Sequence, residues 1–278
     1  MKLKRHLKCF VAGVIAATVF HTQAWAQSPV LDRIKEAGVI RVGVKADYRP
    51  FGFLDSDGKI IGVEPDLAKD VASRLGVDLE LVQVQTANRM EFLQQGRIDL
   101  IIATMSVNEQ RRRAVGVIEP YYYAGGTAVL LKKGSGLTSW SQLEGKRICG
   151  TQGAYYNRNV AQKYKAQIVA FPSSTEAQSA LLTGSCEGFL QDSTLLASML
   201  ADPGGRWNGY EMPLPVEDLQ FWAVAVAQDE LKTPYGDLMR KIVEDWHRSE
   251  FLLKEEKKWG LAPSDFLREQ HERFRNAP

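Results

Sequence analysis

Apolar residues in the first half of the chain form short runs of strand length, and amphipathic stretches separate them. The predicted strands cover residues 38–44, 78–84 and 98–104, and a predicted hairpin over 51–64 turns at Asp57-Gly58. A helix is predicted from Pro65, as its first residue, to a stop at Gly76, and a shorter one over 88–96. Strands that alternate with helices predict an α/β domain with a largely parallel sheet.

The same alternation begins again after residue 130. Its predicted strands cover 145–151, 166–171 and 187–192, with a helix over 174–184, a further apolar run over 219–226 and two or three helices after Pro234. The chain therefore crosses between two strand–helix sets, near 121–130 and again near 220–226. We predict a two-lobed α/β protein with a cleft between the lobes. Its parts are lobe 1 (27–124), lobe 2 (125–224) and a C-terminal return to lobe 1 (225–278).

The first 26 residues have the pattern of an export signal. Four basic side chains precede an apolar core over 10–20, which is too short to span a membrane, and Ala24-Trp25-Ala26 offers a cleavage site. No later stretch is apolar enough for a membrane span. We therefore expect a periplasmic protein that is cleaved near Ala26 and works as a soluble monomer.

Removing that segment changes the charge balance of the chain. It contains four of the 35 Lys and Arg residues and none of the 33 Asp and Glu residues, so the mature chain has 31 basic and 33 acidic residues. The resulting net charge of −2 gives no electrostatic basis for binding nucleic acid.

Cysteine and histidine are too few for most metal, redox or nucleophilic sites. After cleavage, Cys149 and Cys186 remain, and they form either one disulfide or two buried thiols. The remaining histidines, His247 and His271, lie in a charged helical stretch, and we expect both at the surface. We predict no metal site, no cofactor and no nucleophilic triad.

Polar residues with binding chemistry follow the predicted strands, where ligands of open α/β sheets bind. These candidates are Lys45, Tyr48, Arg89, Thr104, Ser106 and Arg111 in the first set, and Tyr156 and Asp192 in the second. A guanidinium binds a carboxylate through two N–H groups, and an aspartate pairs with an ammonium. An arginine in one lobe opposite an aspartate in the other therefore predicts a site for an α-amino acid zwitterion.

The stretch "DLIIATMSVNEQRR" (99–112) predicts a strand, a Thr/Ser loop and a helix that opens with arginines. Cations are disfavoured at a helix N-terminus, so this placement calls for a partner. Neighbouring helical residues lie about 100° apart, so Arg111, Arg112 and Arg113 cannot all face one cleft. We expect one of them to bind ligand and the others to be solvated.

Taken together, these motifs resemble family 3 periplasmic solute-binding proteins, the amino-acid receptors of ABC importers. The motifs are "GVKADYRPFGFLDSDGKIIGVEPDLAKDVASRLG", "LQQGRIDLIIATMSVNEQR", "EPYY", "GTQGAYY" and "FLQD", which together cover nearly all of residues 30–265. The resemblance implies two α/β lobes joined by two hinge strands that close on the ligand. It also implies a membrane permease as partner.

Several residue roles follow from this resemblance. Arg111 matches the arginine that binds the ligand α-carboxylate, with Thr104 and Ser106 at hydroxyl positions of the same loop. Asp192 matches the aspartate for the α-ammonium, and Tyr48 matches an aromatic wall. The chain departs from the family pattern where N-E-Q-R replaces T-P-E-R, so that Asn108 would cap the helix.

The ligand side chain is the open question. Lys45 occupies a position that often has an acidic residue in receptors for basic amino acids. The motif "ANR" (87–89) resembles the Asn-Arg of glutamate and aspartate receptors. Two cations beyond Arg111 favour glutamate or aspartate, with a polar neutral ligand such as glutamine as the alternative. Lys45 could instead be a solvated loop residue, and Arg89 could be held in a salt bridge.

An enzyme is the main alternative to a receptor. Cyclohexadienyl dehydratase-like proteins resemble these receptors and would need a general acid or base in the cleft. The sequence places no histidine or glutamate there. A sensor is a third hypothesis, but such a protein would need a partner to transmit the signal. We therefore expect a binding protein rather than an enzyme.

Overall fold

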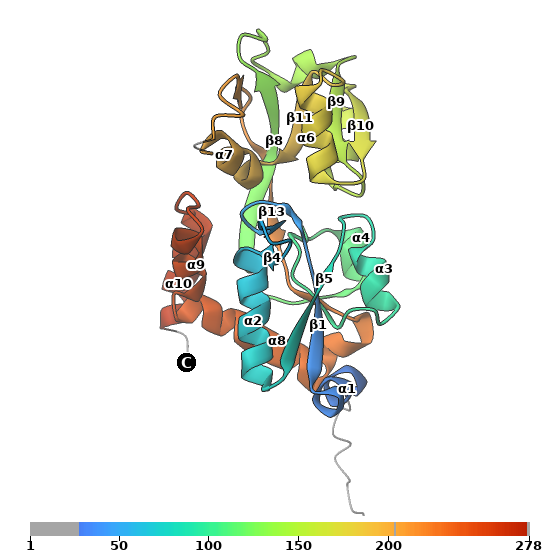
Figure 1. Ribbon diagram of the computed structural model, residues 1–278, viewed down its shortest axis with the longest axis vertical. Coiled ribbons are helices and arrows are strands. Elements are labelled where there is room, and N and C mark those ends of the chain that lie inside the picture. The colour runs from blue at the N-terminus through green and yellow to red at the C-terminus, as the bar shows by residue number, and fades with distance from the viewer. Residues whose placement is uncertain (1–27, 203, 277–278) are drawn as a thin grey trace, which may run out of the picture.

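The structure, a computed structural model, describes residues 28–202 and 204–276 and consists of two α/β lobes joined by strands (Figure 1). The predicted signal peptide lies outside the described residues. Lobe 1 contains a five-stranded sheet in the order β5-β1-β6-β14-β7. Its strands are β1 (Val39–Val44), β5 (Asp78–Gln83), β6 (Leu100–Ile101), β7 (Gly116–Val117) and β14 (Ala225–Val226).

Helices cover the sheet of lobe 1, and the C-terminal segment belongs to this lobe (Figure 1). The helices are α1 (Pro29–Ala37), α2 (Val63–Leu75), α3 (Arg89–Gln94), α4 (Glu109–Ala114), the 3-10 helix η2 (Gln228–Lys232), α8 (Pro234–Arg248), α9 (Phe251–Lys258) and α10 (Asp265–Arg275). A small antiparallel sheet joins β2 (Asp47–Tyr48), β3 (Gly52–Leu54) and β4 (Ile60–Ile61). The described residues include no helix long and apolar enough to cross a membrane.

Lobe 2 contains the second sheet, in the order β10-β9-β11-β8-β12, with β13 also paired to β8. Its strands are β8 (Tyr123–Lys132), β9 (Arg147–Thr151), β10 (Gln167–Phe171), β11 (Gly188–Asp192), β12 (Tyr210–Glu211) and β13 (Glu217–Trp222). Its helices are the 3-10 helix η1 (Trp140–Leu143), α5 (Tyr156–Tyr164), α6 (Ser174–Leu182) and α7 (Ser193–Leu200). β9, β10 and β11 run parallel, as their helical crossovers require.

Two antiparallel strands, β8 and β13, join the lobes (Figure 1). β8 follows β7 of lobe 1, β13 precedes β14 of lobe 1, and both belong to the sheet of lobe 2. Trp222, at the end of β13, is fully buried there and packs against the rings of Phe51 and Tyr123. The two-lobed α/β fold predicted from the strand pattern is thus confirmed.

Three local predictions need correction. α2 begins at Val63, so Pro65 is its third residue, because Val63 N–H and Glu64 N–H already bond to the carbonyls of Pro50 and Phe51. The predicted hairpin exists, but β2 adds a third strand to it. His247 is buried rather than at the surface, with Nε2 2.8 Å from the Tyr121 carbonyl, and burial lowers its pKa to about 4.

The two mature cysteines form a disulfide. Cys149 in β9 is bonded to Cys186, which lies just before β11, and both are buried in lobe 2. The bridge therefore ties the two neighbouring parallel strands whose carboxyl ends carry Thr151 and Asp192.

Candidate functional site

Most of the predicted site residues surround one small cavity between the lobes. Lobe 1 contributes Tyr48, Thr86, Arg89, Thr104, Ser106 and Arg111, and lobe 2 contributes Ala154, Tyr155, Tyr156, Gln191 and Asp192. Of the eight predicted residues, all except Lys45 line it. The cavity lies at the carboxyl ends of strands from both sheets, as the topology of open α/β sheets favours.

The loop after β6 is held by a buried carboxylate below it. Thr104 has a left-handed backbone with φ 45°, which is uncommon for a residue other than glycine. Its N–H donates to Glu64 Oε1 at 2.6 Å, and the Tyr122 hydroxyl donates to the same oxygen at 2.6 Å. These bonds hold the backbone at Thr104, which lines the cavity together with Ser106.

Arg111 is the arginine of the 111–113 run that faces the cavity. Asn108 caps α4 by accepting the Arg111 N–H at 2.9 Å, so the predicted cap is confirmed. The helix opens with Glu109, and the arginines occupy its last turn, where cations are favoured; the prediction that it opens with arginines was wrong. Arg111 is buried, whereas Arg113 is exposed.

The Arg111 guanidinium connects the two lobes. Nη1 donates to the Ser106 carbonyl at 2.8 Å, and Nη2 donates to the Gly153 carbonyl of lobe 2 at 3.0 Å. Gly153 has φ 78°, and a Cβ there would come within 2.9 Å of Ala87 Cα across the cleft. Burial and the charge of Arg89 lower the pKa of Arg111 to about 9, so it remains a cation at neutral pH.

Asp192 faces Arg111 from the other lobe, at the end of β11. Its Oδ2 accepts the Tyr48 hydroxyl at 2.5 Å, while its Oδ1 is buried without a hydrogen-bond partner. Burial raises the pKa of Asp192 to about 6, although the Tyr48 hydrogen bond and the charge of Arg89 oppose this. The carboxylate is therefore ionised at neutral pH, with one oxygen free for a cation.

Arg89, at the start of α3, is held by a backbone carbonyl. It is buried, donates from Nη1 to the Ala103 carbonyl and leaves Nε without a partner. Among the described residues it forms no ion pair with a carboxylate, so the salt-bridge interpretation does not hold.

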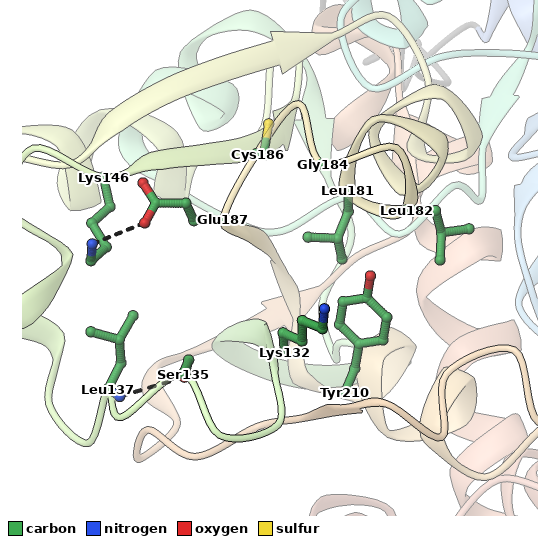
Figure 2. A pocket seen from close by; sticks show the side chains of 10 residues that line it. All are labelled: Lys132, Ser135, Leu137, Lys146, Leu181, Leu182, Gly184, Cys186, Glu187 and Tyr210. Atoms are coloured by element: carbon green, nitrogen blue, oxygen red, sulfur yellow. Dashed lines mark hydrogen bonds and ion pairs between the residues drawn. The ribbon is translucent and has the colours of Figure 1, made fainter.

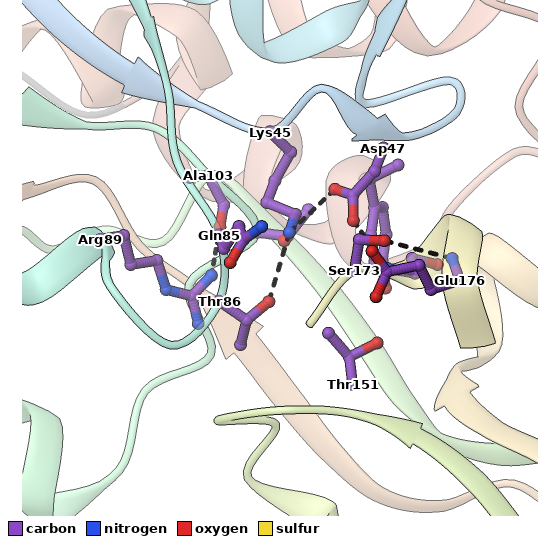
Figure 3. Close-up of polar contacts among 12 residues, drawn as sticks. Lys45, Asp47, Gln85, Thr86, Arg89, Ala103, Thr151, Ser173 and Glu176 are labelled. Carbon is purple, nitrogen blue, oxygen red and sulfur yellow. Dashed lines mark hydrogen bonds and ion pairs between the residues drawn. The ribbon is translucent and has the colours of Figure 1, made fainter. Parts of the chain in front are cut away.

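Lys45 lies behind the cavity wall and not on it. Its side chain is 0% exposed, and its Nζ is 2.9 Å from Asp47 Oδ1 and 3.4 Å from Thr86 Oγ1 (Figure 3). The interpretation as a solvated loop lysine is therefore wrong, and Lys45 is not among the residues that line the cavity. Asp47 neutralises this cation because a buried ammonium needs a counter-ion.

Some of the cavity residues were not predicted from the sequence. Thr86 lies just before the "ANR" motif, and Gln191 precedes Asp192 in β11, where strand alternation predicts the opposite face. At the end of the strand both side chains reach the cavity, and Tyr156 donates its hydroxyl to Gln191 Oε1. Glu64 was missed because its carboxyl acts through backbone contacts that no local pattern reveals.

Glu64 should make stability depend on pH. Burial raises its pKa from 4.5 to about 7, so the folded state holds a proton that the unfolded state releases above pH 4.5. Stability from this group is thus fully present below about pH 4.5 and is lost as the pH rises through 7, by an amount on the order of 3 kcal/mol.

In urea unfolding between pH 5 and 8, Glu64→Gln should lose less stability with rising pH than wild type. The exposed Glu144→Gln should follow wild type, and parallel curves for wild type and Glu64→Gln would contradict this account.

A second hollow in lobe 2 does not have the character of this site. Lys132, Leu182 and Tyr210 line it, together with the Lys146–Glu187 ion pair at 2.9 Å (Figure 2). It contains none of the predicted residues and does not reach lobe 1. The described part of the chain also has no cluster of three or more His, Cys, Asp or Glu that could hold a metal.

Comparison with known proteins agrees with this geometry. The family model of bacterial extracellular solute-binding proteins, family 3, matches residues 40–270. The chain belongs to this family. Among similar proteins, the ABC transporter glutamine-binding protein GlnH of Bacillus subtilis is 30% identical over 84% of this chain and 85% of its own length. The glutamate/aspartate import solute-binding protein of Salmonella typhimurium is 24% identical over 87% and 80%.

Solved structures show the same two-lobed fold. A mutant of ArgBP from T. maritima superposes with a TM-score of 0.76, at 26% identity over 83% of this chain and 98% of that chain. An ancestral amino-acid-binding protein described as a precursor of cyclohexadienyl dehydratase superposes with a TM-score of 0.70, at 25% identity over 82% and 98%. The family resemblance inferred from the motifs is thus confirmed.

Proposed function

We propose that this protein is the periplasmic binding component of an amino-acid ABC importer and that its ligand is an acidic L-amino acid, glutamate or aspartate. The opposed charges of Arg111 and Asp192 in one small cavity carry this proposal, because they match the carboxylate and ammonium of a zwitterion. The protein works as an exported monomer that hands its ligand to a membrane permease.

Arg89 supports an acidic side chain over a neutral one. Once Arg111 and Asp192 are engaged by the α-groups, Arg89 remains as a buried cation with an unpartnered N–H. A ligand carboxylate would satisfy that N–H and the charge together. Lys45 contributes less than its position in the sequence suggests, since Asp47 already neutralises it.

Closure follows from contacts with both lobes. A ligand held by Arg111 of lobe 1 and Asp192 of lobe 2 binds the closed form better than the open one and shifts the population toward closure. The closed pair of lobes is then the form that the permease receives.

A thermal-shift panel on protein refolded to remove carried-over ligand tests the proposal. The panel contains the twenty amino acids, several dicarboxylates and prephenate, the last to test dehydratase-like recognition. A ligand at 100 times its dissociation constant should stabilise the protein by about 2.7 kcal/mol, and we expect this for glutamate or aspartate. A shift only with neutral or basic amino acids would contradict acidic specificity, and one only with prephenate would favour the enzyme.

The same panel with Arg89→Met isolates the role of Arg89. We expect the shift with glutamate or aspartate to disappear, while any shift with glutamine persists, because only the charged side chain loses its partner. Arg97→Met is the matched control, since Arg97 stacks on Phe92 at the exposed end of α3. An equal loss of the thermal shift for acidic and neutral ligands would show that Arg89 does not distinguish between ligand side chains.

A further inference from the structure

Lys45 and Asp47 form a buried ion pair beside the cavity. The side chain of Lys45 is 0% exposed and that of Asp47 is 11% exposed, and Nζ lies 2.9 Å from Oδ1 (Figure 3). Burial lowers the pKa of Lys45, and Asp47 opposes that shift. Asp47 is therefore the counter-ion that favours the charged form of the buried Lys45 and cancels its charge.

The second oxygen of Asp47 binds the other lobe. Oδ2 accepts the N–H of Ser174 at 2.7 Å, and Ser174 is the first residue of α6 in lobe 2. That N–H has no partner within the helix, and the positive end of the helix dipole favours a carboxylate. Because Asp47 lies in β2 of lobe 1, this hydrogen bond exists only when the lobes are together.

Lys45 is close enough to influence the cavity although it does not line it. Its Nζ is 3.4 Å from Thr86 Oγ1, and Thr86 shares the cavity wall with Arg89. One side chain thus separates the ammonium from the ligand space. Whether the cavity experiences this charge depends on Asp47.

We propose that Asp47 is a positioning residue for ligand binding, with one oxygen holding lobe 2 closed through α6 and the other cancelling the charge of Lys45. Arg89 is then the cation that meets the ligand side chain. This inference rests on the proposed amino-acid binding function. It assigns to Asp47 two effects, one on the affinity for every ligand and one on the preference between charged and neutral ligands.

Ser174→Pro separates the two effects. Proline is well suited to the first position of a helix, and Ser173 has the extended backbone (φ −123°, ψ 159°) that precedes proline. The substitution removes the N–H that Asp47 binds and leaves the Lys45–Asp47 pair in place. Ser174→Ala is the matched control, because it removes the hydroxyl and keeps the N–H.

In calorimetric titrations, Ser174→Pro should weaken glutamate and glutamine equally, by about tenfold, the worth of a hydrogen bond to a charged group. Ser174→Ala should bind as wild type does. Asp47→Asn should also weaken binding. In a pH series it should raise the glutamate-to-glutamine affinity ratio by roughly tenfold at the acidic end, where the unpaired Lys45 stays protonated, and not at the alkaline end, where Lys45 is neutral. Adding Lys45→Met to Asp47→Asn should return the ratio to that of wild type.

Unchanged affinity in Ser174→Pro would overturn the interlobe contact, and a ratio in Asp47→Asn that stays at the wild-type value at every pH would overturn the charge effect. If wild type binds no amino acid, the proposed function fails. The contact between Asp47 and Ser174 is then tested by small-angle X-ray scattering instead. Ser174→Pro should then have a larger radius of gyration than wild type and Ser174→Ala. Equal radii would overturn the inference independently of the ligand.

Discussion

Replacing Arg111 or Asp192 by alanine is expected to weaken amino-acid binding about a hundredfold or more in titration calorimetry. Each substitution leaves one charge of the zwitterion buried in the cavity without its partner, and burying an unpaired charge is costly. The two residues come from opposite lobes, so each variant also removes one side of the contact that links ligand binding to closure.

Arg113→Ala is the control for this experiment. Arg113 lies on the same short helix as Arg111 but is exposed, so its loss should leave affinity within about twofold of wild type. Affinity close to wild type in Arg111→Ala or Asp192→Ala would refute the assignment of the zwitterion to this cavity. A thermal midpoint near that of wild type would show that lost binding does not reflect unfolding.

Removing the disulfide is expected to destabilise the protein by about 4 kcal/mol, the chain-entropy value for a bridge across 37 residues. The double variant Cys149→Ala with Cys186→Ala avoids placing an unpaired thiol or hydroxyl in the interior of lobe 2. Urea unfolding monitored by circular dichroism would measure the loss.

A reducing agent provides the matched comparison. It should bring wild type to the stability of the double variant and should leave the double variant unchanged. Equal stability of oxidised wild type and the double variant would show that the bridge constrains little of the unfolded chain. Since β9 and β11 also pair through backbone hydrogen bonds, the variant should still fold and bind.

Much of the fold could be predicted because it depends on local repetition. Apolar runs and helix stops placed β1, α2 and β11 to within a few residues, and the restart after residue 130 indicated the second lobe. Strand ends likewise predicted Arg111 and Asp192 at the cleft, each at the edge of its own sheet where the carboxyl ends of the parallel strands lie. The family motifs added the hinge closure and the membrane permease as expected partner.

The sequence by itself thus determined the two α/β lobes, the cleft edge and the residue types around it, all of which follow from periodicity and chain order. Only the tertiary structure decided which charges are paired: among the described residues, Asp47 neutralises Lys45, whereas Arg89 has no acidic partner. It also buried His247, joined the two cysteines and placed Glu64 beneath the Thr104 loop. These outcomes depend on side chains that meet across elements and lobes, and burial then sets the cost of each charge; no local pattern contains that information.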